Sequence, residues 1–247
     1  MIPIVISPSQ QLSNKCVMCT SEANHCRAIA NELYNILKND SNFKPVVVPI
    51  LGGTESKYLA GAVCFSNDFM GDDSSNGFHC CIHTDAYNGK SFGASAFYMT
   101  PGGKGQLFTQ NILSELSALT PWNDLACTSR PELYELKYTT ASAGLFEISY
   151  HDEPTQSKWI HDNIINIAMA IAKGIYKTVG LNMPDPYIQS DDWKTHLIKD
   201  AFTAGLIFDC EQWLRRKDEP APVWMVLKTE LTLMKILQNC YKNKGGR

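Results

Sequence analysis

Short apolar runs alternate with longer amphipathic segments along most of this chain. The apolar runs, which favour strands because they are rich in β-branched and aromatic residues, are residues 2–6, 43–51, 78–83, 93–99, 133–136 and 143–150. Apolar side chains recur every three or four positions, as in helices that face a core, over residues 22–38, 55–65, 104–118 and 156–178. This alternation predicts βαβ units, and therefore an α/β fold with a twisted, mostly parallel sheet flanked by helices.

The composition changes near residue 181. Two prolines in Leu181-Asn-Met-Pro-Asp-Pro indicate a linker, and helical patterns follow over about 191–205 and 221–241. We therefore expect a main domain over 1–181, a linker over 182–190 and a small helical module over 191–247. A module of this size buries little surface alone, so we expect it to dock on the main domain or on a partner.

Composition excludes several classes of function. The net charge of −3 gives no basic surface for nucleic acid, and no apolar run is long enough to span a membrane. The segment from Met1 to Ser7 has no basic region and reads as a buried strand, so we expect no signal peptide and synthesis in the cytoplasm. The nine cysteines then stay reduced. Cys16-x-x-Cys19 lacks a clear second pair, which favours small buried thiols over a structural zinc site.

The run Cys80-Cys81-Ile82-His83-Thr84-Asp85-Ala86-Tyr87-Asn88-Gly89 places a histidine at the end of a strand. The loop after such a strand opens into the crevice where α/β folds bind ligands. His83 could be a metal ligand, a general base or a packing residue. Glu147 lies inside Ala-Gly-Leu-Phe-Glu-Ile-Ser-Tyr, where a carboxylate is costly to bury unless it is bound. It is either a salt-bridge partner or a general base beside a metal.

Glu22 opens a helix, a position that favours carboxylates in any protein. Together with His83 and Glu147 it completes a set of one imidazole and two carboxylates at one sheet edge. Histidine and carboxylate ligands with an open position are typical of a catalytic zinc hydrolase, in which a free carboxylate takes the proton of the attacking water.

Several sequence blocks, in this order and spacing, resemble the zinc-dependent N-acetylmuramoyl-L-alanine amidases of the Amidase_3 type, especially the branch of phage endolysins and clostridial autolysins. The resemblance runs from residue 2 to about 181. The blocks are Ile6-Ser7-Pro8-Ser9-x-Gln11 with Asn14, Ser21-Glu22-Ala23 with Cys26, Ser66-Asn67, Ile82–Gly89, Leu133-Tyr134-Glu135-Leu136, Phe146–Asp152 and the helix Trp159–Val179.

The resemblance implies roles for individual residues. Glu22 and His83 match zinc ligands of the family, and Glu147 matches its catalytic glutamate. Most members carry a further histidine ligand in Asp-Pro-Gly-His-Gly-Gly after the first strand. Here the aligned stretch is Ser7-Pro8-Ser9-Gln10-Gln11, so the third ligand is expected to be Gln11, with Gln10 or another residue as the alternative.

The other histidines have weaker assignments. His151 follows Glu147 by four residues and either assists catalysis, by orienting substrate or stabilising an oxyanion, or supports the site from behind. His25 lies one turn after Glu22 on the same side of the helix and could compensate for the missing histidine ligand, but a surface or supporting histidine is the favoured interpretation. His79 is too far along its strand from His83 to share one zinc, which favours a hydrogen-bonded core histidine. His161 and His196 are expected to be structural.

The resemblance implies a peptidoglycan hydrolase that uses Zn²⁺ to cut the amide between N-acetylmuramic acid and L-alanine of the stem peptide. Its partner is then the bacterial cell wall, on which it acts after release from the cytoplasm. The alternatives are a catalytically silent wall-binding protein on the same fold and a zinc peptidase acting on another amide. The C-terminal helices, which carry Trp193, Trp213 and Trp224, would target the wall or form a homo-oligomer.

Overall fold

The computed structural model describes residues 1–18, 20–184, 194–195, 198, 201, 209–217 and 219. The chain divides into two compact units, Met1–Met183 and Pro184–Arg247. Within the second unit the structure describes one short helix, α8 (Cys210–Arg215). Most of the expected linker, 182–190, and of the C-terminal module, 191–247, lies outside the described residues, as do Trp193, His196 and Trp224. Those parts of the domain division therefore stay predictions.

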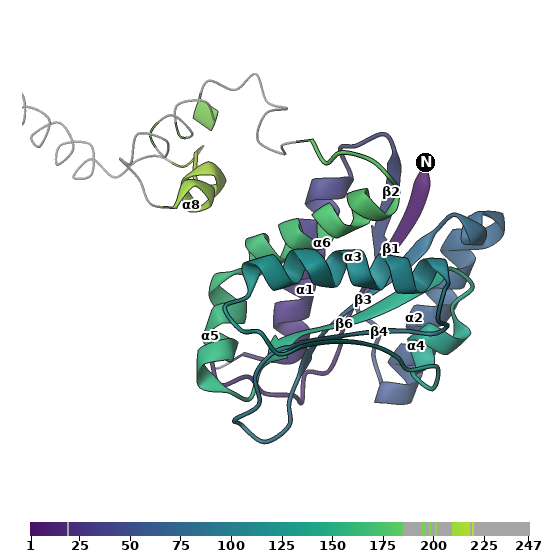
Figure 1. The fold of residues 1–247 in the computed structure, drawn as a ribbon, viewed down its shortest axis with the longest axis horizontal. Helices are drawn as coiled ribbons and strands as arrows, with labels where there is room; N and C mark the ends of the chain where they lie inside the picture. Colours follow the sequence, from purple (N-terminus) through teal and green to yellow (C-terminus); the bar gives the residue numbers. More distant parts are fainter. Residues whose placement is uncertain are drawn as a thin grey trace, which may run out of the picture. The chain divides into compact units, whose positions relative to one another are not determined.

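The first unit is built on one six-stranded sheet (Figure 1), which is mostly parallel, as expected. Its strands, in the order β2-β1-β3-β6-β4-β5, are β2 (Phe43–Val47), β1 (Ile2–Pro8), β3 (Phe78–Asp85), β6 (Ser142–Tyr150), β4 (Ala94–Tyr98) and β5 (Leu125–Ser129). All neighbouring strands are parallel except β4 and β6, which are antiparallel. The carboxyl ends of β1, β3 and β6 therefore meet at one edge of the sheet.

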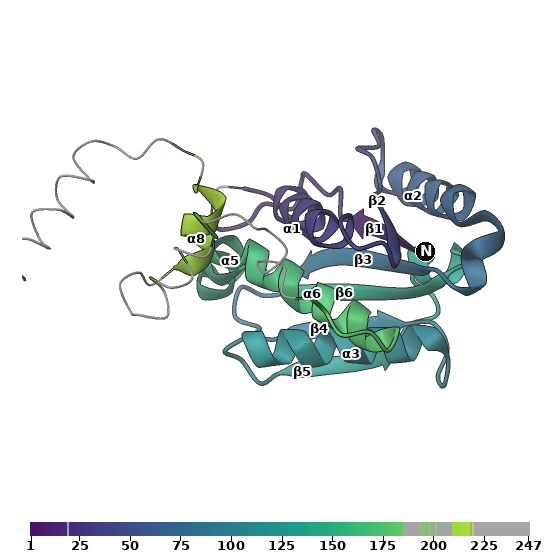
Figure 2. The same cartoon turned by 90° about the horizontal axis from the view of Figure 1, so that it is seen from above.

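Helices cover both faces of this sheet. The helices of the main unit are α1 (Glu22–Leu37), α2 (Glu55–Met70), α3 (Lys104–Leu119), α4 (Tyr134–Tyr138), α5 (Pro154–Asp162) and α6 (Ile164–Thr178), with a 3₁₀ turn, η1 (Gly71–Ser75). Helices α1, α3 and α6 bury the larger core against the even-numbered side chains of β3, such as Cys80 and Ile82. Figure 2 looks down on this face from above and shows α3 and α6 in front of the strands. Helices α2 and α4 pack on the opposite face, which presents Val5 and Cys81.

The contact between α3 and α6 depends on a glycine. A Cβ atom at Gly174 of α6 would lie 2.4 Å from the Cα atom of Ile112 in α3. Real Cβ atoms do not approach a backbone so closely, so a larger residue would force the two helices apart. Figure 1 shows these helices running side by side across the sheet.

The structure corrects two predicted elements and adds a strand that the sequence patterns do not indicate. Residues 133–136 are not a strand, because Tyr134–Tyr138 form the short helix α4 after a turn that links Leu133 N–H to the carbonyl of Arg130. The edge strand β5 (Leu125–Ser129) was not anticipated. The single helix expected over 156–178 is two helices that meet at Asn163, whose φ of −116° and ψ of 20° are not helical.

The remaining expectations concern thiols and membranes. No disulfide links the described Cys16, Cys26, Cys64, Cys80, Cys81 and Cys127. Cys19 lies outside the described residues, so the structure does not test the Cys16-x-x-Cys19 pair. In the part of the chain that is described, no helix is both long and apolar enough to cross a membrane.

Candidate active site at the carboxyl edge of the sheet

The structure brings Glu22, His83 and Glu147 together at the carboxyl edge of the sheet. His83 lies near the end of β3, and Glu147 is its direct register partner on β6. Glu22 is the first residue of α1, which Ser21 caps by accepting the N–H of Asn24. Parallel strands and a helix start thus deliver the three side chains to one place, as the sequence predicts.

Glu22 and His83 are in direct contact. His83 Nδ1 lies 3.1 Å from Glu22 Oε1, and both side chains are buried. Asn14 Nδ2 donates to Glu22 Oε2 at 2.6 Å. Although burial raises the pKa of Glu22, hydrogen bonds from His83 and Asn14 lower it below its usual value. Glu22 is therefore ionised, with one oxygen directed at the imidazole.

Glu147 and His83 each have one buried polar atom without a hydrogen-bond partner among the described residues, Oε2 and Nε2 respectively. Burial raises the pKa of Glu147 to about 8, and the neighbouring Asp85 and Glu22 add to the rise while His83 opposes it. A carboxyl group with such a pKa exchanges protons near neutral pH, which is the property that a general base and acid requires.

A third carboxylate, Glu135, lies on the other side of His83. Glu135 Oε2 is 3.7 Å from His83 Nε2. Burial lowers the pKa of His83, but the nearby carboxylates of Glu135, Glu22 and Glu147 raise it well above its usual value. The sequence comparison singled out the block Leu133–Leu136 without giving Glu135 a role, since a contact between residues 83 and 135 leaves no mark in local spacing.

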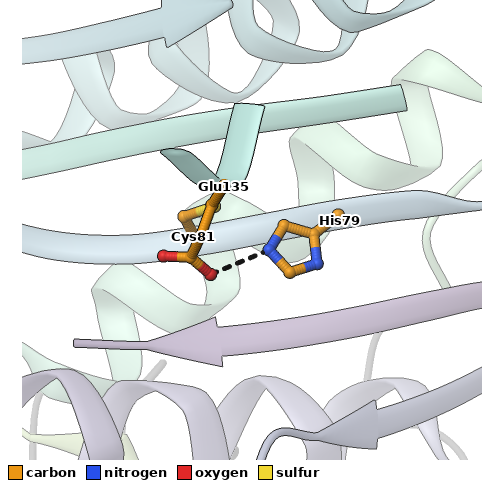
Figure 3. A group of neighbouring side chains, drawn as sticks. All are labelled: His79, Cys81 and Glu135. Carbon is orange, nitrogen blue, oxygen red and sulfur yellow. Dashed lines mark hydrogen bonds and ion pairs between the residues drawn. The ribbon is translucent and has the colours of Figure 1, made fainter. Parts of the chain in front are cut away.

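Behind His83 lies a fully buried cluster of His79, Cys81 and Glu135 (Figure 3). One potential ligand atom from each lies within 4.8 Å of the others. His79 Nε2 contacts Glu135 Oε1 at 3.0 Å, and His79 Nδ1 lies 2.9 Å from Ser66 Oγ. His79 is thus the hydrogen-bonded core histidine that was expected. Burial and the nearby Glu135 raise the pKa of the Cys81 thiol well above 9, so it stays protonated.

The loop after β1 distinguishes the two glutamines proposed as the third ligand. Gln10 turns away, because its Nε2 donates to Pro49 O at 3.1 Å and its Oε1 accepts from Leu51 N at 2.6 Å. Gln11 Oε1 lies 2.7 Å from Asn14 Nδ2, the same group that donates to Glu22. Gln11 is therefore connected to the site through Asn14, and Gln10 is not.

The other histidines lie around this centre. His151 is buried, with Nδ1 lying 2.9 Å from both the carbonyl and the hydroxyl oxygen of Thr84. His25 does not contact Glu22 or His83: its Nδ1 lies 3.5 Å from Cys16 Sγ and its Nε2 lies 3.4 Å from His161 Nδ1. Burial and the nearby His161 lower the pKa of His25 to about 4, which keeps it neutral.

Comparison with known families gives one clear match. Residues 4–177 match the model of a family described as Amidase_3, N-acetylmuramoyl-L-alanine amidase. No curated protein sequence matches the chain significantly.

Solved structures of such amidases share the fold. The catalytic domain of CwlV, an N-acetylmuramoyl-L-alanine amidase from Bacillus (Paenibacillus) polymyxa var. colistinus, is 17% identical with a TM-score of 0.63, over 74% of this chain and 100% of that one. An N-acetylmuramoyl-L-alanine amidase from Clostridium difficile 630 is 17% identical with a TM-score of 0.62, over 72% and 97%. The catalytic domain of the CD27L endolysin, which targets Clostridia difficile, is 16% identical with a TM-score of 0.61, over 74% and 100%. At these identities the likeness establishes the fold of the main unit.

Proposed function

Because the chain belongs to the Amidase_3 family of N-acetylmuramoyl-L-alanine amidases, we propose that Glu22, His83 and Glu147 form its zinc-dependent active site. The substrate is peptidoglycan, and the bond cut joins the lactyl group of N-acetylmuramic acid to L-alanine of the stem peptide. The observation that carries this proposal is the convergence of these side chains at one sheet edge, with a buried Glu147 oxygen that has no partner among the described residues.

The donor set fits a divalent cation. Three carboxylates, Glu22, Glu135 and Glu147, surround the single imidazole of His83, and a buried excess of negative charge is unfavourable unless a cation compensates it. Imidazole nitrogen and carboxylate oxygen are both common ligands of zinc. Glu22 and His83 would hold the ion, which supplies a Lewis acid for the scissile carbonyl and for water.

Gln11 is the proposed third ligand. Its amide oxygen lies beside Asn14, which contacts Glu22, whereas both amide atoms of Gln10 are engaged by residues 49 and 51. An amide oxygen is a weaker zinc ligand than an imidazole. We therefore expect this chain to bind zinc less tightly than relatives with the second histidine.

Glu147 moves the proton. Its carboxylate accepts a proton from the water that attacks the carbonyl carbon, which gives a tetrahedral intermediate. The same group then donates this proton to the departing nitrogen as the carbon–nitrogen bond breaks. The products are a lactyl carboxylate on the sugar and a free amino group on L-alanine. Without metal the pKa of Glu147 is about 8, and a bound cation would lower this pKa and so favour the carboxylate that accepts the water proton.

His151 is proposed to shape the rim of the site. Its Nδ1 donates to the carbonyl of Thr84, the residue after His83, because a carbonyl can only accept. His151 therefore holds the end of β3, and its Nε2 is the atom left to orient a substrate.

The test uses a defined muropeptide and mass spectrometry. The full chain loaded with zinc should release a peptide with a free N-terminal L-alanine, and a chelator should abolish this release. The Glu147→Gln variant should bind cell walls but not cleave them. Cleavage at another amide would favour the zinc peptidase. Wall binding without any cleavage by the wild-type protein would favour the silent wall-binding protein.

We also propose that the segment 191–247 targets the wall or mediates homo-oligomerisation, and that the protein reaches the wall after release from the cytoplasm. The full chain and a variant ending at residue 182 should then differ in sedimentation on purified walls or in oligomeric state by light scattering. Identical behaviour in both assays would reject a role for this segment.

A further inference from the structure

Glu135 lies at the centre of a buried polar network that reaches the active site. It comes from α4, which packs on the face of the sheet that presents His79, Cys81 and His83 in alternate positions of β3. Glu135 is only 4% exposed. Figure 3 shows its carboxylate directed at His79 and beside Cys81. A buried carboxylate needs several donors, so the identity of these donors decides its role.

The two carboxylate oxygens of Glu135 have different neighbours. Oε1 accepts from Ser7 Oγ at 2.5 Å and from His79 Nε2 at 3.0 Å. Oε2 faces His83 Nε2 at 3.7 Å. This last distance is longer than a hydrogen bond, as catalytic contacts often are before ligands bind. One oxygen is therefore anchored to the fold, and the other is directed at the proposed zinc ligand.

The anchoring group is itself fixed. His79 donates through Nε2 to Glu135, and its Nδ1 lies 2.9 Å from Ser66 Oγ. Helix α2, through Ser66, and strand β1, through Ser7, thus hold Glu135 from two directions. Both serines are buried. This network fixes the position of the carboxylate without using the oxygen that faces His83.

The same cluster is a poor metal site. Cys81 is fully buried, and a metal bound in this cluster would have to displace Ser7 and His79 from Glu135 Oε1. The hydrogen bonds present are those of a satisfied network around one carboxylate.

We propose that Glu135 is a positioning residue for His83. It accepts the Nε2–H of His83 and thereby leaves Nδ1, the atom that faces Glu22, to bind the metal ion. Histidine ligands of metals commonly donate their second N–H to such a carboxylate, which fixes the tautomer and the ring orientation. The proposal rests on His83 being a metal ligand, as in the proposed function.

The first test is metal affinity. The full-length Glu135→Gln variant should bind zinc 10–100-fold more weakly in competition with a chromogenic chelator, and Glu135→Asp should recover part of the loss. Excess zinc should restore activity to the Glu135→Gln variant. The matched control is Cys81→Ala, which removes a neighbouring group of the same cluster and should leave the affinity unchanged. Wild-type affinity in Glu135→Gln would overturn the proposal.

A second zinc equivalent that is lost in Cys81→Ala would also overturn it, because His79, Cys81 and Glu135 would then be ligands.

The second test needs neither metal nor activity. In the ¹⁵N-labelled metal-free protein, the Nε2–H proton of His83 should give a downfield, slowly exchanging signal that disappears in Glu135→Gln. Absence of this signal from the wild-type spectrum would reject the contact, even if Glu135→Gln were too unstable to study. A wild-type protein that shows the signal but binds no zinc would instead refute the zinc site of the proposed function.

Discussion

The Glu147→Gln substitution should abolish catalysis and at the same time stabilise the metal-free protein. The buried Oε2 atom of Glu147 lacks a hydrogen-bond partner within the described part of the chain, and burial raises the pKa of this carboxyl from 4.5 to about 8. Each pKa unit corresponds to ~1.4 kcal/mol, so ionising Glu147 in the folded state costs up to roughly 4–5 kcal/mol. Glutamine keeps the shape of the side chain and never ionises.

The direction of the pH dependence follows from proton binding. Because the folded protein holds the Glu147 proton more tightly than the unfolded chain, this group disfavours folding increasingly as pH rises from 4.5 to about 8. The free energy of unfolding of the Glu147→Gln variant should therefore match that of the wild-type protein near pH 4.5 and exceed it at pH 9. Added zinc should reduce the difference, since a cation stabilises the carboxylate.

The assay is urea unfolding in the presence of a chelator, followed by tryptophan fluorescence between pH 5 and 9. Turnover of a defined muropeptide, measured in parallel with zinc, should fall by about 10²–10⁴-fold, which is the usual contribution of a general base. Glu55→Gln is the control, because Glu55 is an exposed carboxylate in the first turn of α2. A Glu147→Gln variant that retains wild-type turnover would refute the proton-transfer role. Equal stability of the two proteins at pH 9 would refute the reasoning about the buried charge.

Three further predictions concern other parts of the main unit. Gly174→Ala should destabilise the main unit by about 1–3 kcal/mol, since the new Cβ atom would lie 2.4 Å from Ile112 Cα. Calorimetry should show a lower Tm, and an unchanged Tm would contradict the tight contact between α3 and α6. Gln11→Ala should weaken zinc binding in a chelator competition roughly tenfold or more, whereas Gln10→Ala should not. If both substitutions weaken zinc binding equally, Gln11 is not the third ligand. His151→Asn keeps a hydrogen-bond donor near the Thr84 carbonyl, so the variant should retain the fold. A much lower kcat/KM with unchanged stability would then show that His151 Nε2 acts on substrate.

The layout of the candidate active site could be predicted because it follows from a simple rule. His83 and Glu147 each occur near the end of an apolar run, and parallel strands bring such ends to one edge of the sheet. The sequence also predicts that His79 is a core histidine, and its contacts with Ser66 and Glu135 confirm this.

Other features could not be predicted, because local patterns do not contain them. The run Leu133–Leu136 is too short for its apolar spacing to distinguish a strand from a helix, and it proved to belong mainly to α4. The role of Glu135 depends on Ser7, which is 128 positions away in the sequence. The link from Gln11 through Asn14 to Glu22 depends on how the loop after β1 folds back toward α1.

His83 and Glu147 are register partners on β3 and β6. Hydrolytic activity should therefore appear only when these two strands have paired in the native register. Successive side chains of a strand point to opposite faces, so a slip of β6 by one residue against β3 would carry Glu147 to the other side of the sheet. The two strands are separated in sequence by the whole β4-α3-β5-α4 segment, and such distant pairings form late in folding. During refolding, helical circular dichroism should therefore recover before hydrolysis does, and the delay between them would time the closure of the central strand pair.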